Sequence, residues 1–387
     1  MRLTDICDFQ GGSQPPKDEW LFEKQEGYIR MLQIRDFTQS EKVVPEYVKI
    51  SKSTKISKST KICQADDILI ARYGASIGKI LTGLSGAYNV AIMRAIPDTH
   101  MLQKKYLYYY LKSPYFQTAI LNVGSRAAQA GFNKEDLSKL EIKCPLLSEQ
   151  DSIIDILQKV ESIIGKRKKE LIFLGELVKA RFVEMFGTLH DNENGFDIVT
   201  IEDVCSLIKD GTHQTPQYTE DKKEGYKFLS SKDVMSQKVD WTNIKYIPAE
   251  LHEKLYATIK PQRNDILMSK NGVNYGVAAV NDTDEVFDIY VSLALLRPKK
   301  IIDPVFLKCV INNPETKWQF DSSIKGIGVP NLHLGEIKKT RMFLPPIELQ
   351  NQFADFVRAI DKSKVAIKKS LDETQILFDS LMQKYFG

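Results

Sequence analysis

The residues that most resemble a reactive site lie between Gly74 and Lys79, in the stretch GASIGK. A glycine-rich loop that ends in lysine is the pattern that cradles nucleotide phosphates, with serine or threonine after the lysine to hold magnesium. Here three residues separate the glycines instead of four, and isoleucine follows the lysine. We therefore interpret the stretch as a turn that needs glycine dihedral angles, not as a nucleotide site.

Other catalytic patterns are incomplete. KSPYF (112–116) has only one of the two prolines of the amino-methyltransferase motif, and no glycine-rich cofactor loop precedes it. A nuclease centre would combine Asp98 with Glu141 and Lys143, but solvated charges at a strand edge explain these residues more simply. The five histidines lack metal-ligand spacing, and the five cysteines form no CxxC pair, which predicts reduced thiols and no metal site. The chain is therefore expected to be a binding protein.

Polar side chains on glycine-bearing loops are better candidates for function. Arginine, glutamine and asparagine can read the edges of guanine and adenine, and lysine can contact bases or phosphates. In the first half of the chain the candidate DNA contacts are Ser13, Gln14, Gln33, Arg35, Arg72, Tyr73, Ser76, Lys79, Ser125, Arg126, Gln129 and Asn133. In the second half they are Thr212, His213, Gln214, Ser231, Lys232, Lys270, Asn271, Asn274, Tyr275, Lys325, Asn331 and His333. The alternative for each is that it only caps its own turn.

A lysine-rich stretch lies between Lys42 and Lys61. It contains six lysines and one acid, and the hexapeptide KISKST occurs in it twice in tandem. Lys52 and Lys55 are the candidates here for contact with DNA phosphates, which would add affinity without sequence information. The alternative is a solvated loop. The second half of the chain fills the same interval with IPAELHEKLYATIK (247–260), for which we expect a short helix.

These loops recur because the chain consists of two tandem copies of one unit of roughly 200 residues. LTDIC (3–7) aligns with IEDVC (201–205), and DDILIARYGASIG (66–78) aligns with NDILMSKNGVNYG (264–276). KCPLLSEQ (143–150) aligns with FLPPIELQ (343–350), and RFVEMFG (181–187) aligns with LMQKYFG (381–387). Identity between the halves is low in the loops, so we expect a shared fold with different exposed side chains.

Each copy is expected to be an α/β (α+β) globule followed by a long helix. Short strand-like runs such as ILIARY, VAIMRAI, DILMSK and VSLALLRP alternate with glycine turns and one helical stretch around KKYLYYYL or PVFLKCVI. The predicted bounds are 1–147 for the first globule, 148–187 for its helix, 188–347 for a linker and the second globule, and 348–387 for the second helix. Val199–Ile201 aligns with Met1–Leu3, so we expect no helix before the first globule.

Apolar residues in the two long helices alternate at spacings of three and four, which is typical of a coiled coil. The expected seam of the first helix is Ile153, Ile156, Val160, Ile163, Arg167, Leu171, Leu174, Val178, Arg181 and Met185. That of the second is Phe353, Phe356, Ile360, Ser363, Ile367, Leu371, Thr374, Phe378, Leu381 and Tyr385. We expect the helices to pair as an antiparallel coiled coil with internal pseudo-twofold symmetry, which suits a ligand with two half-sites, such as duplex DNA.

Composition and charge are compatible with this interpretation. The 387 residues are 43% hydrophobic and 27% charged, and the formal net charge of +4 is mildly basic. The first residues, MRLTDICDF, contain acids and no long apolar run, so we expect no signal peptide. No apolar stretch is long enough for a membrane span. We therefore expect a cytoplasmic protein without a membrane partner.

The order of these features resembles the specificity subunit of type I restriction–modification systems. The resemblance covers the whole chain and is carried by the PLLSEQ and PPIELQ stretches before the two helices, the near-200 offset and the Phe-Gly helix ends. It implies that each globule binds one half of an asymmetric bipartite duplex target and that the helix pair sets the spacer. It also implies two adenine-methyltransferase partners, restriction/translocase subunits in the full complex, and S-adenosylmethionine held by the methyltransferases, with no cofactor on this chain.

Two other interpretations stay open from the residues alone. The globules could bind protein as a scaffold without base readout, or the chain could be a stand-alone DNA-modifying enzyme. The target sequence, the spacer length and the methylated adenines do not follow from the sequence. The unlike loop residues predict unlike half-sites, since near-identical halves would predict a palindrome.

Overall fold

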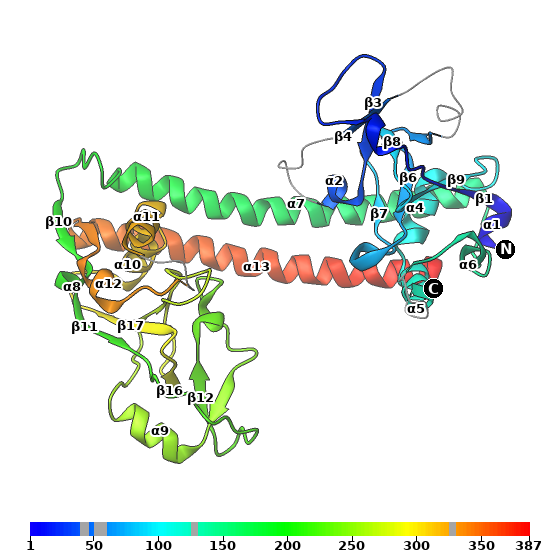
Figure 1. Cartoon of the computed structure of the whole chain (residues 1–387). Coiled ribbons are helices and arrows are strands. Elements are labelled where there is room, and N and C mark those ends of the chain that lie inside the picture. The colour runs from blue at the N-terminus through cyan, green and yellow to red at the C-terminus, as the bar shows by residue number, and fades with distance from the viewer. Residues whose placement is uncertain (39–45, 50–59, 125–130, 325–329) are drawn as a thin grey trace. The chain divides into compact units, whose positions relative to one another are not determined.

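The computed structural model describes residues 1–38, 46–49, 60–124, 131–324 and 330–387. The chain divides into two compact units. Unit 1 comprises Met1–Lys168 and Lys369–Gly387, and unit 2 comprises Lys169–Lys368. Two 40-residue helices, α7 (Leu147–Phe186) and α13 (Ile347–Phe386), each contribute one half to each unit (Figure 1). Both helices begin and end one residue before the predicted bounds.

In the described part of unit 1, two sheets form the globule. One is antiparallel, in the order β1-β9-β6-β7. Its strands are β1 (Cys7–Gly11), β9 (Ile92–Pro97), β6 (Ile68–Ala71) and β7 (Ile80–Leu81). The other has the order β2-β4-β3-β8-β5, and in it only β3 and β8 run parallel. Its strands are β2 (Trp20–Leu21), β4 (Glu46–Lys49), β3 (Tyr28–Leu32), β8 (Gly86–Tyr88) and β5 (Ile62–Cys63).

In the described part of unit 2 the same arrangement returns. The antiparallel sheet has the order β11-β17-β14-β15, and the second sheet has the order β13-β12-β16 with β12 and β16 parallel. A further antiparallel pair, β10-β18, corresponds in the described part of unit 1 to the isolated antiparallel bridge between Arg2 and Glu141. The strands are β11 (Cys205–Asp210), β17 (Leu293–Pro298), β14 (Ile266–Ser269), β15 (Ala278–Val280), β13 (Lys245–Ile247), β12 (Tyr226–Leu229), β16 (Phe287–Ile289), β10 (Asp197–Thr200) and β18 (Arg341–Leu344). The predicted repeat and mixed fold class are confirmed.

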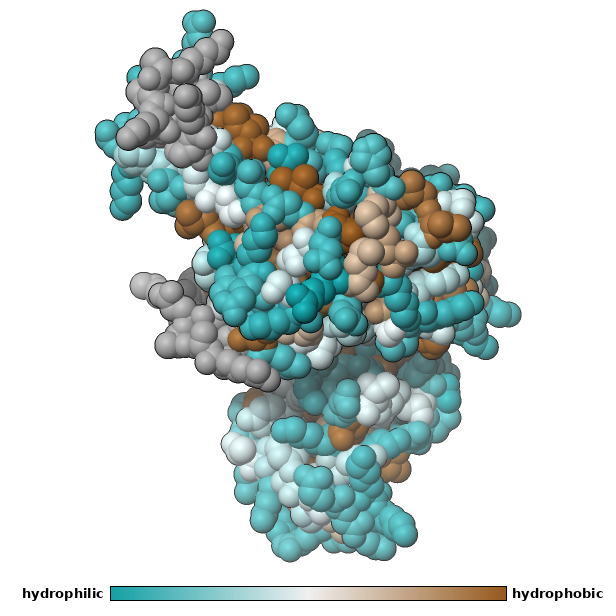
Figure 2. Space-filling view, turned by 90° about the vertical axis from the view of Figure 1, so that its right-hand side faces the viewer, coloured by the Kyte–Doolittle hydropathy of each residue, from teal (hydrophilic) through white to brown (hydrophobic). Residues whose placement is uncertain are grey.

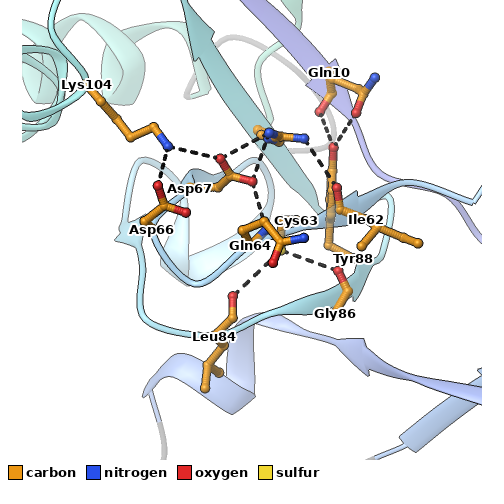
Figure 3. A network of polar contacts seen from close by, with 11 residues as sticks. Gln10, Ile62, Cys63, Gln64, Asp66, Asp67, Leu84, Gly86, Tyr88 and Lys104 are labelled. Carbon is orange, nitrogen blue, oxygen red and sulfur yellow. Dashed lines mark hydrogen bonds and ion pairs between the residues drawn. The ribbon is translucent and has the colours of Figure 1, made fainter.

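The repeated DIL sequence has a structural role in both sheets. β6 and β14 are buried along their whole length, as their continuous apolar sequences require. The aspartate before each strand is also buried and pairs with an arginine of the neighbouring strand. Asp67 lies 2.9 Å from Arg94, and the carboxylate of Asp265 accepts two hydrogen bonds from Arg297 (2.9 and 2.8 Å). Figure 3 shows Asp67 among its polar neighbours, where Lys104 also reaches it. Burying a carboxylate is costly unless it is paired and hydrogen-bonded.

The shorter helices confirm one prediction and correct another. Helices α4 (Lys104–Lys112) and α10 (Pro304–Ile311) lie where one helix per globule is expected, and α9 (Ala249–Tyr256) lies within the interval expected to be helical. A second helix then follows in each unit, α5 (Pro114–Gly124) and α11 (Pro314–Ser323). Its proline fits the first helical turn, where no backbone donor is needed, so it begins a helix rather than only ending one. The remaining described α-helices are α1 (Leu3–Ile6), α2 (Ile34–Thr38), α6 (Lys134–Leu137), α8 (Ile201–Val204) and α12 (Leu334–Lys339), and short 3₁₀-helices lie at Lys17–Glu19, Gly74–Ser76 and Ser231–Val234.

The long helices pair antiparallel within each unit. In unit 1 the side chain of Arg167 on α7 donates to the carbonyl oxygen of Ser370 on α13 (2.6 Å). In unit 2 the ring of Phe182 on α7 lies 5.5 Å from that of Phe353 near the start of α13. An early part of one helix therefore lies beside a late part of the other in both units, as the coiled-coil pattern predicts.

The predicted seam is correct at most positions and wrong at three. Ile156, Ile163 and Ser363 are exposed, whereas Ile154, Leu157 and Ile164 of α7 are buried. Ile154 and Leu157 belong to the core of unit 1, which also contains residues of α4. The start of α7 therefore packs on its globule as well as on α13. Its buried face is rotated about the helix axis relative to the face expected for a two-helix coiled coil.

A buried glutamine fixes the start of each long helix. The side chain of Gln150 donates to the carbonyl oxygens of Met101 (2.8 Å) and Pro145 (2.9 Å). Gln350 repeats this with Ile301 (3.2 Å) and Pro345 (2.8 Å), and it accepts from the backbone N–H of Asp303 (2.9 Å). This is the physical reason for the glutamine shared by the SEQ and ELQ stretches.

Replacing Gln350 by alanine is expected to lower the free energy of unfolding of unit 2 by about 1–3 kcal/mol, because three backbone groups, two of them in buried hydrogen bonds, lose their partner. Urea denaturation of the Gln350→Ala variant measures the change. Gln352→Ala is the control, since Gln352 is exposed on the same helix, and it should change stability by less than about 0.5 kcal/mol. Equal effects of the two substitutions would contradict the role of Gln350.

Candidate nucleic-acid interface

In unit 2, loops from distant parts of the sequence meet on one short segment, Tyr290–Ser292. The backbone N–H of Val291 donates to the carbonyl oxygen of Thr212 (2.9 Å), and that of Lys270 donates to the carbonyl oxygen of Ser292 (3.0 Å). The backbone N–H of Ser231 donates to the hydroxyl oxygen of Ser292 (3.0 Å). Three of the four predicted recognition loops are thus fixed to one place.

The fourth loop of unit 2 joins through the third. The backbone N–H of Leu332 donates to the carbonyl oxygen of Lys270 (2.8 Å), and Asn271 and Asn331 form an antiparallel bridge. The sheet brings these loops together because β14 and β17 are antiparallel neighbours, so that β14 ends at Ser269 beside Leu293, where β17 begins. The result is a cluster of polar residues on a rigid support, which is the arrangement expected of a recognition surface.

Unit 1 builds the equivalent cluster on Asn89–Ala91. The backbone N–H of Arg72 donates to the carbonyl oxygen of Ala91 (2.8 Å), and the N–H of Asn89 donates to that of Leu32 (3.3 Å). The guanidinium of Arg72 donates from Nε to the carbonyl oxygen of Phe132 (3.2 Å), and Tyr73 forms a bridge with Gly131. In both units, loops that are far apart in the sequence therefore converge on the segment that precedes β9 or β17.

Two glycines make this convergence possible. A Cβ atom on Gly12 would lie 2.0 Å from the carbonyl oxygen of Asn89, and one on Gly211 would lie 2.2 Å from that of Ile289. No side chain fits at such distances, so the first loop of each unit reaches the central segment only with glycine. The glycines of GGSQPP and DGTHQTP are therefore explained by backbone approach.

The candidates of unit 1 have different surroundings. Ser13 accepts a hydrogen bond from the backbone N–H of Lys61 (3.2 Å), and Asn133 caps α6. Gln33 and Arg35 both bind the carboxylate of Glu46. The candidates that carry exposed or half-buried side chains near the Arg72 turn are Gln14, Tyr73, Ser76 and Lys79.

The candidates of unit 2 divide into exposed and buried residues. His213, Gln214, Lys232, Asn274, Asn331 and His333 are exposed, and Thr212, Ser231 and Asn271 are half-buried. Lys270 and Tyr275 are buried, with 4% and 8% of their surfaces exposed. The hydroxyl of Tyr275 donates to Asp321, and hydrogen bonds from Lys317 and Tyr275 hold the pKa of that carboxyl below its usual value. The positions of Lys270 and Tyr275 favour structural roles.

Six candidates lie outside the described residues. They are Lys52, Lys55, Ser125, Arg126, Gln129 and Lys325. They stay predictions.

The central segments Asn89–Ala91 and Tyr290–Ser292 are the feature of the candidate site that the sequence did not indicate. Both directly precede strands that the apolar runs VAIMRAI and VSLALLRP did predict. The signal in the sequence that could have indicated these segments is a turn that occurs in both copies directly before a buried strand. Two further residues of the cluster, Asp210 and Ser292, were also missing from the candidates.

Other chemistry gives no competing centre in the described part of the chain. All five cysteines are free thiols, and burial raises the pKa of Cys7 and Cys205 to about 12. Among the described residues, no group of three or more His, Cys, Asp and Glu side chains is placed to hold a metal ion. No described helix combines the length and the apolar composition that a bilayer span requires. Figure 2 shows a face on which hydrophilic residues dominate and apolar residues form small groups.

The fold and the paired loop clusters define the class of protein: a duplicated binding protein whose two globules present polar loops. The family model described as "Type I restriction modification DNA specificity domain" matches residues 1–172 and 193–375. The chain belongs to this family. It is a DNA sequence-recognition subunit and not an enzyme.

Individual relatives agree with the family. The type I restriction enzyme MjaVIII specificity subunit of Methanocaldococcus jannaschii is 22% identical over 398 residues, which cover 96% of this chain and 88% of the relative. The EcoBI specificity subunit of Escherichia coli is 22% identical over 346 residues, covering 79% and 72%. The solved S subunit from M. genitalium has a TM-score of 0.57 at 15% identity, covering 100% of this chain and 95% of that one. The likeness to this structure shows the shared fold.

Proposed function

We propose that each unit reads one half of an asymmetric, bipartite duplex target through its loop cluster. The observation that carries the proposal is the convergence of the loops on equivalent segments, Asn89–Ala91 and Tyr290–Ser292. Equivalent supports with unlike side chains suit two half-sites of different sequence. Arginine, glutamine and asparagine on such loops match the hydrogen-bonding edges of bases in the major groove.

We further propose that the long helices fix the distance between the half-sites and bind two adenine-methyltransferase subunits. Neighbouring exposed apolar side chains on the helices support a docking role, because contiguous apolar patches on a protein surface mark sites of protein–protein contact. On α7 of unit 2 these are Ile172, Phe173 and Leu177, and on α13 of unit 1 they are Ile376 and Leu377. Restriction/translocase subunits would join the same complex in the cytoplasm.

The methyl donor, S-adenosylmethionine, would be held by the methyltransferase subunits. The glycine turn at Gly74–Gly78 supports this assignment, because its backbone N–H groups donate hydrogen bonds to carbonyl oxygens of the same loop. The N–H of Gly78 donates to the carbonyl oxygen of Ala71 (2.9 Å), and the N–H of Ile77 donates to that of Gly74 (3.0 Å). This chain would contribute recognition and positioning, and its partners would contribute the methyl transfer.

Gln14 and Gln214 provide matched variants that test the assignment of one half-site to each unit. Both side chains are exposed on the first recognition loop of their unit. Methylation of genomic DNA by the complex that contains Gln14→Ala is expected to become less selective at one half of the target, and Gln214→Ala at the other half. A lost bidentate base contact would reduce discrimination by about 1–3 kcal/mol at that position. If both substitutions affect the same half-site, the assignment is wrong.

A further inference from the structure

The same position of the repeat carries a cation in both units, but its partner differs. Arg72 follows β6 and Lys270 follows β14. The end of the first strand lies beside each of them. Gly11 ends β1 opposite Met93, and Asp210 ends β11 opposite Ala294. Arginine is therefore combined with glycine in unit 1, and lysine is combined with aspartate in unit 2.

In unit 2 the combination is a buried ion pair. Nζ of Lys270 lies 2.8 Å from Oδ1 of Asp210, and their side chains are 5% and 18% exposed. Oδ2 of the same carboxylate lies 3.6 Å from Nε2 of His213. A buried ammonium needs a paired charge, so the position of Lys270 depends on Asp210. The pair joins the first loop of the cluster to the third.

In unit 1 the guanidinium of Arg72 lies against the backbone of the glycine. A Cβ atom on Gly11 would lie 3.4 Å from Nη1 of Arg72, so the guanidinium passes over this backbone position. In the described part of the chain its partners are the carbonyl oxygens of Phe132 and Val90 and the ring of Tyr73. Both cations brace their loop cluster, but through different neighbours. Arg72 donates hydrogen bonds to the fourth loop and to the central segment Asn89–Ala91, and Lys270 forms an ion pair with the start of the first loop.

We propose that Asp210 and Lys270 are a positioning pair that sets the geometry of the recognition loop Gly211–Gln214, and that Lys270 itself does not contact DNA. The inference rests on the proposed function, because it concerns how that loop is held for readout. Lys270 would act as Arg72 does on its own loops. His213 and Gln214, which are exposed at the tip of the loop, remain the side chains that face the ligand.

The Asp210→Asn variant distinguishes a positioning role from a purely electrostatic one, because the two roles predict opposite changes in DNA affinity. Removing an acid from a DNA-binding surface strengthens binding if only charge matters. Positioning predicts roughly tenfold weaker binding or more, since Lys270 is left buried without a carboxylate. The measurement is binding of the assembled complex to its methylation target at several salt concentrations. Glu220→Gln is the control, because it makes the same charge change at an exposed residue of unit 2.

The arrangement of unit 1 can be transferred to unit 2 as a rescue. Asp210→Gly and Lys270→Arg are each expected to weaken binding, and the double variant is expected to recover most of the loss. Binding by Asp210→Asn that equals or exceeds the original affinity would overturn the inference, as would a double variant no better than its single variants. Thermal unfolding of each variant identifies losses that come from misfolding alone.

The outcomes also separate this inference from the proposed function. If Gln214→Ala relaxes one half-site while Asp210→Asn binds normally, recognition stands and the positioning pair is wrong. The other outcome is that Asp210 and Lys270 are coupled in thermal unfolding while no loop variant changes DNA binding. The ion pair then stands as a structural feature only. Both the positioning role and the proposed function are overturned, because the globules are not the surface that reads DNA.

Discussion

Replacing Phe186 by alanine is expected to lower the free energy of unfolding of unit 2 by about 3–5 kcal/mol, the largest effect of a single substitution that we predict. Phe186 ends α7 and is fully buried. Its ring centroid lies 4.9 Å from that of Phe306 and 5.5 Å from that of Phe353. Truncation leaves a cavity in a core that joins the globule to both long helices, and close-packed cores relax only partly around such cavities.

Phe173 provides a control of the same residue type on the same helix. It is 67% exposed, so Phe173→Ala should change the free energy of unfolding by less than about 0.5 kcal/mol. The same variant tests the proposed docking role, because loss of an exposed aromatic anchor is expected to weaken methyltransferase binding about tenfold. Urea denaturation and a partner-binding titration give the two readouts. Similar destabilisation by both substitutions would refute the described packing of α7.

Arg72→Ala is expected to weaken binding to the half-site of unit 1 by roughly tenfold to a hundredfold, because it removes two functions at once. The guanidinium donates to the carbonyl oxygens of Phe132 and Val90, and it brings positive charge to the loop cluster. Arg72→Lys keeps the charge and loses the fork of donors, so its affinity should fall between those of the original chain and the alanine variant.

The salt dependence of binding then distinguishes what Arg72 touches. A phosphate contact predicts a uniform loss across sequences and a salt slope smaller by about one, whereas a base contact predicts relaxed specificity at one position. Lys139→Ala is a suitable control because Lys139 makes only surface ion pairs with Glu135 and Asp136. Unchanged binding by Arg72→Ala would remove this loop cluster from the interface.

The strands and the repeat were predictable because they depend on local patterns. The strands β6, β14, β9 and β17 follow from short apolar runs, and the helix seam follows from apolar spacings of three and four; both patterns survive in the two copies. The exposed Ile156 and the buried Leu157 were not predictable, because the face that α7 buries depends on the globule that it packs against. The helix after Pro314 was missed because proline permits both the end of a helix and the start of the next.

The candidate site was predictable at the level of loops and not at the level of side chains. The glycine-bearing stretches around Ser13 and Arg72 meet within unit 1, and those around Thr212 and Lys270 meet within unit 2, as their polarity suggested. Their meeting point at Tyr290–Ser292 depends on pairings between strands far apart in sequence, which no local pattern contains. The burial of Lys270 has the same origin, since its partner Asp210 lies 60 residues away in the sequence.

The most direct test of the central claim is single-molecule mapping of adenine methylation in the host genome with and without this gene. Recognition by two unlike units predicts that one motif, with two different half-sites separated by a fixed gap, loses its methylation when the gene is deleted. Restoring the gene with Gln214→Ala should then return the motif with one relaxed half. A methylation pattern that is the same with and without the gene, while its partner subunits are expressed, would contradict the assignment of sequence recognition to this chain.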